Sequence, residues 1–342
     1  MNAVGSGPKG ARLMDEPNIE RSRHPSDLKY EVYKRRSVRH CIHSFRAMII
    51  MLTSRQKRNL VPWIFLAPAL IIFTWFKFIP MLQGLVMSFY KVNFNQANEW
   101  VGFANFARAF ADTDLHSAVF NTFLYVIVTM VVAAVLAFFL AMLLEGPARH
   151  LRFIRTAIFL PAVTSAAIVA EMWRILFNPT PNGVINQVLS WFGVADQGFL
   201  ASTDQALWVI MLLHIWKAVP YNMVIFIAGL AGISRDLYDA ANVDGASWWN
   251  RLRYVTLPGM IPALSVVLML SFIRGFRVFA EVYATTGGGP SNSTEMIMTH
   301  IYKLGFEQFD YGYASAVSFL LFAFTVLLTL CHLTLKKRIT RY

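Results

Sequence analysis

Charged residues are scarce in this chain of 342 residues: they make up 15% of it, against about 25% in a typical soluble domain. The scarcity is concentrated in long segments, and 117–144 and 311–335 contain no Lys, Arg, Asp or Glu. Hydrophobic residues make up 56%, and the mean hydropathy is +0.48. The sequence therefore predicts a chain that lies partly in lipid, not one that buries a single large soluble core.

Cysteine is also scarce, and the motifs of several enzyme classes are missing. The two cysteines, Cys41 and Cys331, lie near opposite ends of the chain and match no metal or redox spacing. The sequence lacks G-x-x-x-x-G-K-[ST], so it does not hold ATP phosphates by that route. It also lacks H-E-x-x-H and a nucleophile elbow. A membrane-embedded enzyme is thus left without a visible catalytic constellation, and we expect no cofactor in this chain.

Six apolar segments are long enough to cross a membrane, which takes about 20 residues. They are 62–90, 117–144, 156–177, 205–231, 259–283 and 312–335. The predicted fold class is all-α, a polytopic bundle of six transmembrane helices. No internal repeat is visible, which counts against the repeat-built secondary transporters.

Positive charge is distributed unevenly around these segments. Residues 1–61 hold 13 Lys and Arg against 5 Asp and Glu, out of a net charge of +12. With the N-terminus inside, the cytoplasmic segments hold 23 Lys and Arg, and the opposite segments hold Lys91, Arg108 and Lys303. The positive-inside rule then predicts a multi-pass cell-membrane protein with both termini in the cytoplasm. Without aromatic platforms or a known module, this basic charge does not indicate nucleic-acid binding.

Three regions follow from these patterns. Residues 1–33 are rich in Gly, Pro, Ser and charge and are predicted to be a disordered cytoplasmic tail. Residues 34–60 are predicted to form a basic amphipathic helix, which lies along anionic headgroups or packs against a partner subunit. Residues 61–342 form the six-span domain, with a long cytoplasmic loop at 232–258.

That loop carries the signals of an ordered helix–turn–helix. Ser234 is suited to an N-cap, and Gly245 is suited to the residue just past a helix end. A second helix is predicted to run through Trp248 and to stop before Pro258. Small and apolar residues recur near a helical period along the loop. We interpret it as a docking surface for another protein, with an ordinary connecting loop as the alternative.

The loop resembles the EAA motif of ABC importer permeases in Asp239-Ala-Ala, Gly245 and Val255-x-Leu257-Pro258. Asp239 stands where that family usually has Glu, which keeps the charge. Further signatures are similar to the maltose and glycerol-phosphate permeases of the carbohydrate-uptake branch, and the resemblance covers roughly residues 60–335. These signatures are Phe159-Leu-Pro-Ala162, Trp173-Arg174, Phe177-Asn-Pro179, Trp216 with Pro220-Tyr221, Ala228-Gly-Leu230, and Gly287-Gly-Gly-Pro290 with Thr294. Gly-Gly-Pro is more typical of the first permease half.

The resemblance implies a permease subunit of an ATP-driven, binding-protein-dependent importer of a sugar or sugar-like solute. It implies four kinds of partner besides membrane lipid: a second homologous permease, two ATP-binding cassette ATPases that hold ATP and magnesium, an extracytoplasmic solute-binding protein, and the sugar or polyol. In this family the loop is a coupling helix that fits a cleft on the ATPase. The coupling residues that it implies are Asp239, Ala240, Ala241, Asp244, Gly245, Leu257 and Pro258.

Ionisable residues inside spans are costly, about 2.5–3.5 kcal/mol each near the centre. Here they are Lys77, Glu171, Arg174, His214, Lys217, Arg274, Arg277 and Glu281. We expect the first three to lie near an interface, where snorkelling satisfies them. The family's sugar contacts, carried over by the resemblance, are His214, Ala218, Tyr221, Ser271, Gly275 and Val278. Several polar groups of the maltose-type site are missing, which argues against maltose itself. The basic residues within the spans leave a phosphorylated or acidic solute open.

Arg274 is added to the candidate solute site, and with Lys217 it is expected to gate the pathway or to pair with Glu281. A structural role for the basic residues is the alternative. At the level of function, a proton-driven secondary transporter using Glu171, His214 or Glu281 predicts uptake by this chain alone. An assembly subunit shares the topology but has no need of a coupling loop.

Overall fold

The computed structural model describes residues 54–92 and 97–339. They belong to two compact units, one ending at Ile79 and the other beginning at Pro80. The predictions for the tail at 1–33 and for most of the basic helix at 34–60 lie outside the described residues.

The first unit contributes one long apolar helix. Helix α2 (Ser54–Phe73) passes directly into a π-helical turn, η2 (Thr74–Phe78). Pro62 and Pro68 lie inside α2 without ending it. The Lys77 ammonium lies 5.8 Å from the centre of the Phe73 ring, so this cation within the first span packs on an aromatic face.

The core of the second unit is three helices that pack against one another: α5 (Thr113–Leu144), α9 (Ala206–Ala231) and α12 (Leu257–Phe276). Small residues at Ala133, Ala134, Ala137 and Ala141 form a buried stripe on α5. Between α9 and α12, a Cβ placed on Gly229 would lie 2.6 Å from the Ala263 Cβ. Small residues thus let the backbones approach closely, as in membrane bundles.

Within residues 54–92 and 97–339, five helical stretches are long and apolar enough to span a membrane, and a sixth candidate is a bent pair. The pair is α6 (Arg149–Val163) and α7 (Ala166–Leu176), which meet at an angle of 93°. The span predicted at 156–177 therefore falls on this bent pair, and the bend itself was not predicted. Thr164 and Ser165 both have extended backbone at the break, which ends one helix and starts the next.

The fifth span also differs from its prediction of 259–283. One continuous helix runs from α11 (Trp248–Arg251) through the π turn η4 (Leu252–Thr256) into α12. It ends at Phe276, and a separate short helix, α13 (Ala280–Thr285), follows.

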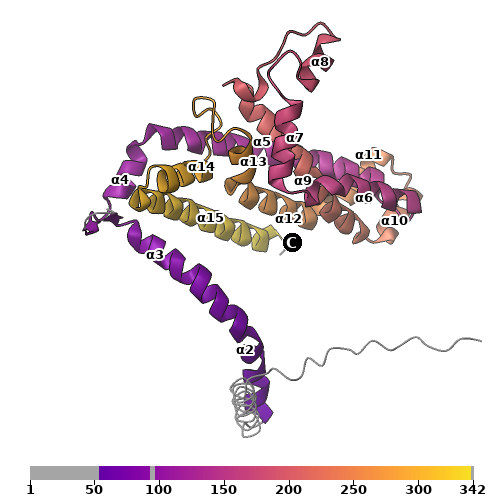
Figure 1. Ribbon diagram of the computed structural model, residues 1–342. Coiled ribbons are helices and arrows are strands. Elements are labelled where there is room, and N and C mark those ends of the chain that lie inside the picture. Colours follow the sequence, from indigo (N-terminus) through magenta and orange to yellow (C-terminus); the bar gives the residue numbers. More distant parts are fainter. Residues whose placement is uncertain (1–53, 93–96, 340–342) are drawn as a thin grey trace, which may run out of the picture. The chain divides into compact units, whose positions relative to one another are not determined.

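The remaining elements are short, apart from the last span. Strands β1 (Tyr90–Lys91) and β2 (Glu99–Trp100) pair antiparallel, with Tyr90 opposite Trp100. The other elements are α3 (Ile79–Met87), α4 (Ala104–Ala111), α8 (Val184–Ser190), η3 (Phe199–Ala201), α10 (Arg235–Val243), α14 (Ile297–Tyr302), η5 (Lys303–Glu307) and α15 (Tyr311–Ile339). Within the second unit, α10 and α11 lie at one end of the bundle, and α4 and α14 lie near the other (Figure 1).

Candidate functional site

The loop at 232–258 forms the expected pair of capped helices. The Ser234 Oγ accepts a hydrogen bond from the Asp236 backbone N–H and caps α10. Gly245 has φ of +71°, the left-handed conformation that favours glycine past a helix end. The Ser247 Oγ then caps α11. An Arg251–Asn242 side-chain hydrogen bond of 2.6 Å ties the two helices together.

Pro258 does not end the second helix, contrary to the prediction. It lies inside the continuous helix Trp248–Phe276, directly after the π turn and at the start of α12. The π turn before it is closed by a hydrogen bond from the Leu257 N–H to the Leu252 carbonyl. The second helix of this loop and the fifth span are therefore one continuous helix, Trp248–Phe276.

Most of the predicted coupling residues lie at the surface. Six are exposed, and Ala241 is partly exposed; the six are Asp239, Ala240, Asp244, Gly245, Leu257 and Pro258. The apolar Val243, Trp248 and Trp249 nearby are exposed as well. Exposed apolar residues among carboxylates and arginines are typical of a protein-interaction surface.

The ionisable residues of α9, α12 and α13 come together in what we call the cationic cluster, defined as Lys217, Tyr221, Arg274 and Glu281. The Lys217 Nζ lies 3.5 Å from the Glu281 Oε1, and the two side chains are only 15% and 16% exposed. The pairing predicted for these two residues is thus present. It neutralises two charges that are costly inside a membrane protein.

Arg274 does not pair with Glu281. Its guanidinium lies 3.9 Å from the centre of the Tyr221 ring, a cation–π contact worth about 0.5–2 kcal/mol. Tyr221 is one turn after Lys217 on the same face of α9. Next along α9, the Asn222 amide donates a hydrogen bond of 3.4 Å to the Ser271 Oγ of α12. Asn222 was not predicted as a site residue, because nothing in the neighbouring sequence distinguishes it from other polar residues.

Two polar groups beside the cluster are buried without a hydrogen-bond partner in the described part of the chain. They are the Nδ1 of His214 and the hydroxyl of Tyr125, and their rings lie 5.3 Å apart. An unpaired buried group costs about 1–3 kcal/mol, so each calls for a partner such as water or solute. Tyr125 had no sequence signal, because it lies in a span without charge.

Two of the predicted solute contacts pack inside the bundle instead. Val278 is buried in the hydrophobic core with Tyr125 and Val126 of α5. A Cβ on Gly275 would lie 2.8 Å from a Val126 methyl group. Both positions therefore favour helix packing over solute contact. Ala218 is partly buried on α9.

Glu171 and Arg174, expected near an interface, form an exposed ion pair of 3.0 Å within α7.

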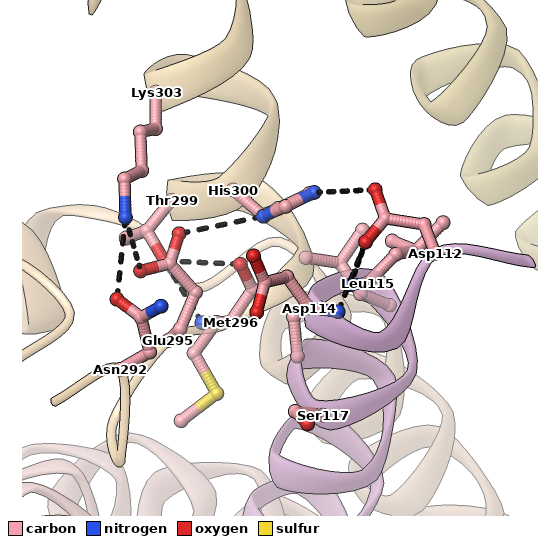
Figure 2. A network of polar contacts seen from close by, with 12 residues as sticks. Asp112, Asp114, Leu115, Ser117, Asn292, Glu295, Met296, Thr299, His300 and Lys303 are labelled. Atoms are coloured by element: carbon pink, nitrogen blue, oxygen red, sulfur yellow. Dashed lines mark hydrogen bonds and ion pairs between the residues drawn. The ribbon is translucent and has the colours of Figure 1, made fainter. Parts of the chain in front are cut away.

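A second group of charges, which we call the capping network, comprises Asp112, Glu295, His300 and Lys303 (Figure 2). The buried His300 lies between two carboxylates, 3.7 Å from Glu295 and 3.9 Å from Asp112. Lys303 approaches Glu295 from the other side at 3.9 Å. The network joins the start of α5 to α14 and to the segment that follows Gly287-Gly-Gly-Pro290.

Asp112 caps α5 through hydrogen bonds from the backbone N–H groups of Asp114 and Leu115. It also accepts a 2.7 Å hydrogen bond from the Tyr313 hydroxyl of α15. Burial acts to raise the pKa of Asp112, but these three hydrogen bonds and the nearby His300 outweigh it. They hold the pKa below its ordinary value.

Comparisons with known proteins agree with this architecture. Residues 117–341 match the family model described as the binding-protein-dependent transport system inner membrane component. The arabinooligosaccharides transport system permease protein AraP of Halalkalibacterium halodurans is 31% identical over 288 residues, 83% of this chain and 90% of that protein. The trehalose/maltose permease protein MalF of Thermococcus litoralis is 30% identical over 79% of this chain and 92% of its own length.

A solved structure also matches: a bacterial ABC transporter involved in the import of the acidic polysaccharide alginate, with a TM-score of 0.73 and 27% identity. The match covers 83% of this chain and 97% of that one. The predicted all-helical bundle is confirmed, and the secondary-transporter and assembly-subunit alternatives are set aside. Family members are non-catalytic transport subunits, and partner ATPases bind the ATP. This chain is a multi-pass inner-membrane permease subunit of a binding-protein-dependent ABC importer, of the carbohydrate-uptake type.

Proposed function

We propose that the loop at 232–258 docks on a cytoplasmic ATPase subunit and drives this permease, with both chain termini on the cytoplasmic side. The observation that carries the proposal is the capped, exposed helix–turn–helix around Gly245, continuous with α12. ATP-driven closure of the ATPases then moves the continuous helix from α11 to α12 and changes the exposure of the cationic cluster. The excess of Lys and Arg in the segments predicted to be cytoplasmic supports this orientation.

The complete importer in this proposal contains a second homologous permease, two ATPase subunits and an extracytoplasmic solute-binding protein. The binding protein delivers solute to the external loops, including 178–204 and 286–310. A related alginate importer has been solved in complex with a periplasmic protein that carries an alginate pentasaccharide. The relatives' names include arabinooligosaccharides and trehalose/maltose. We therefore propose an oligosaccharide as the solute.

Within the permease, the solute contacts assigned by this proposal are His214, Tyr221, Ser271 and Arg274. They share adjoining faces of α9 and α12, and Tyr221 and Arg274 are exposed in the isolated subunit. Ala218, one turn after His214, leaves room beside them. Such a face meets the partner permease across the translocation pathway.

The docking role is tested by Gly245→Glu in the full importer. A Cβ at Gly245 meets nothing within 4 Å, so the variant adds charge to an open surface, and its cost to the fold is the backbone strain of a side chain at φ of +71°. We expect at least about a tenfold loss of co-purified ATPase subunits and of uptake, equivalent to about 1.4 kcal/mol of docking free energy.

The matched control is Gly193→Glu. Gly193 has φ of +72° and the same open surroundings, so it carries the same backbone strain as Gly245. It lies after α8, away from the docking loop in the sequence, and we expect this variant to retain the ATPase subunits. Normal ATPase recovery with Gly245→Glu, or equal loss of the ATPase subunits in both variants, contradicts the docking role. Uptake is not compared for Gly193→Glu, because this residue lies in a loop proposed to receive the binding protein.

A further inference from the structure

The charges of the cationic cluster do not balance. Lys217 is neutralised by Glu281 at 3.5 Å. Arg274 contacts the Tyr221 ring but forms no ion pair with any carboxylate of the described residues. One full positive charge on a membrane-spanning helix is therefore left without a counter-charge from the described part of this subunit.

The surroundings of Arg274 stabilise its positive charge but supply no negative charge to neutralise it. Arg274 lies in the last turn of α12, where the helix dipole favours a cation. The Tyr221 ring adds a favourable contact. A neutral side chain such as glutamine at this position would not need these two stabilising interactions. Charged residues retained in a span usually line a water-filled pathway and mark the route of a substrate.

The geometry leaves the arginine free to bind an anion. The guanidinium carbon lies over the Tyr221 ring, and a guanidinium carries its N–H donors in one planar fork. Arg274 is exposed in the subunit. A planar fork of N–H donors matches the two oxygens of a carboxylate or a phosphate.

Hydrogen-bonding groups for a sugar lie beside this donor. Ser271 is three residues before Arg274 and therefore on the same side of α12. Its hydroxyl is held by the Asn222 amide at 3.4 Å. The buried His214 Nδ1 has no hydrogen-bond partner within residues 54–92 and 97–339.

We propose that the solute is a saccharide that bears an anionic group, a carboxylate or a phosphate, and that Arg274 binds this group during passage. Ser271 and Tyr221 contact the neutral hydroxyls. The inference rests on the proposed function, because it places solute on this face of α9 and α12. A carboxylate supplied by the second permease is the competing counter-charge, and the test separates the two.

The test uses the complete importer, with its binding protein and ATPases, reconstituted in liposomes. Three matched probe pairs are compared: galacturonate trisaccharide with galactose trisaccharide, mannuronate trisaccharide with mannose trisaccharide, and glucose 6-phosphate with glucose. ATP-dependent uptake is measured for wild type, Arg274→Gln and Arg274→Lys. The control is Arg108→Gln, since Arg108 also lies over a tyrosine ring, at 4.0 Å, but is neutralised by Asp310 at 2.6 Å.

We expect wild type to take up the charged member of at least one pair, and Arg274→Gln to lower that uptake at least about tenfold, as loss of a charge-assisted bond predicts. Arg274→Lys should retain part of it, and Arg108→Gln should retain nearly all. A carboxylate or a phosphate is assigned by the pair that responds.

The proposal is overturned if an assembled, ATP-hydrolysing importer takes up none of the charged probes. It is also overturned if Arg274→Gln lowers neutral and charged uptake equally, which indicates a carboxylate from the partner permease. Failure of the subunits to assemble, or ATP hydrolysis without any coupling to this permease, refutes the proposed function itself.

Discussion

Two arginines of this permease lie over tyrosine rings at nearly the same distance but in different electrostatic surroundings. Arg108 lies 4.0 Å from the Tyr313 ring and 2.6 Å from the Asp310 carboxylate. Arg274 lies 3.9 Å from the Tyr221 ring and has no carboxylate partner within the residues that the structure describes. The ring contact is common to both, so the counter-charge is what distinguishes them.

The same contrast separates the two regions around these arginines. In the capping network each carboxylate has a cationic or hydrogen-bonding partner, and the network ties the start of α5 to α14 and α15. In the cationic cluster one cation is paired and one is left over. The capping network holds distant segments together through contacts among its own members, whereas Arg274 has no counter-charge among the described residues.

The largest effect is expected from Glu281→Gln, which makes the cationic cluster still less balanced. The change leaves Lys217 mostly buried without its partner, and breaking such a pair costs about 3–5 kcal/mol. We expect a large loss of uptake and a lower midpoint of thermal unfolding in detergent, read by tryptophan fluorescence.

The double variant Lys217→Gln/Glu281→Gln is the control for this prediction. It removes both charges, so it should recover most of the lost stability. The single variant Lys217→Gln completes the comparison. If the double variant loses as much stability as the two single variants added together, the ion pair contributes nothing, and the interpretation of the cluster is wrong.

A smaller effect is expected from Asp112→Ala in the capping network. The variant loses an N-cap and the Tyr313 hydrogen bond, which together contribute about 1–3 kcal/mol. Because the folded-state pKa of Asp112 lies below its ordinary value, the stability that it contributes is present above the unfolded pKa of about 3.9. That stability is lost as the pH falls through the folded value.

The pH dependence supplies the check. The difference in unfolding midpoint between wild type and Asp112→Ala should be constant from pH 7 to about pH 5 and should shrink below about pH 4. Asp114→Ala is the matched control, since Asp114 lies in the first turn of α5 but is not its N-cap. A difference that widens in acid contradicts the assignment.

Features that depend on local sequence were predictable in this fold. The lengths of the apolar segments predicted the helical bundle, and Ser234 and Gly245 marked the ends of α10 because capping is set by neighbouring residues. The bend between α6 and α7 was missed, since Thr164 and Ser165 are also compatible with a continuous helix. Pro258 was misread because a proline that suits a helix stop can also lie inside a continuous helix, here directly after a π turn.

The only part of the site that could be predicted from the sequence was the part formed by charged residues within the spans. Lys217 and Glu281 are costly inside spans, so their pairing was expected. The contacts of Arg274 with Tyr221 and of Asn222 with Ser271 depend on how α9 and α12 are rotated against each other. Tyr125 beside His214 depends on the same packing. Sequence periodicity does not specify such rotations between helices that are apolar on every side.

The smallest effect is expected from Arg108→Gln, and it sharpens the comparison of the two arginines. The Arg108 side chain is 51% exposed, so its ion pair with Asp310 contributes about 0–1 kcal/mol. We expect a slightly lower unfolding midpoint and unchanged discrimination between charged and neutral probes. Both results follow if the counter-charge, and not the tyrosine contact, determines the role of each arginine. Should Arg108→Gln alter that discrimination as strongly as Arg274→Gln, the two sites are equivalent in transport, and the missing counter-charge at Arg274 has no special meaning.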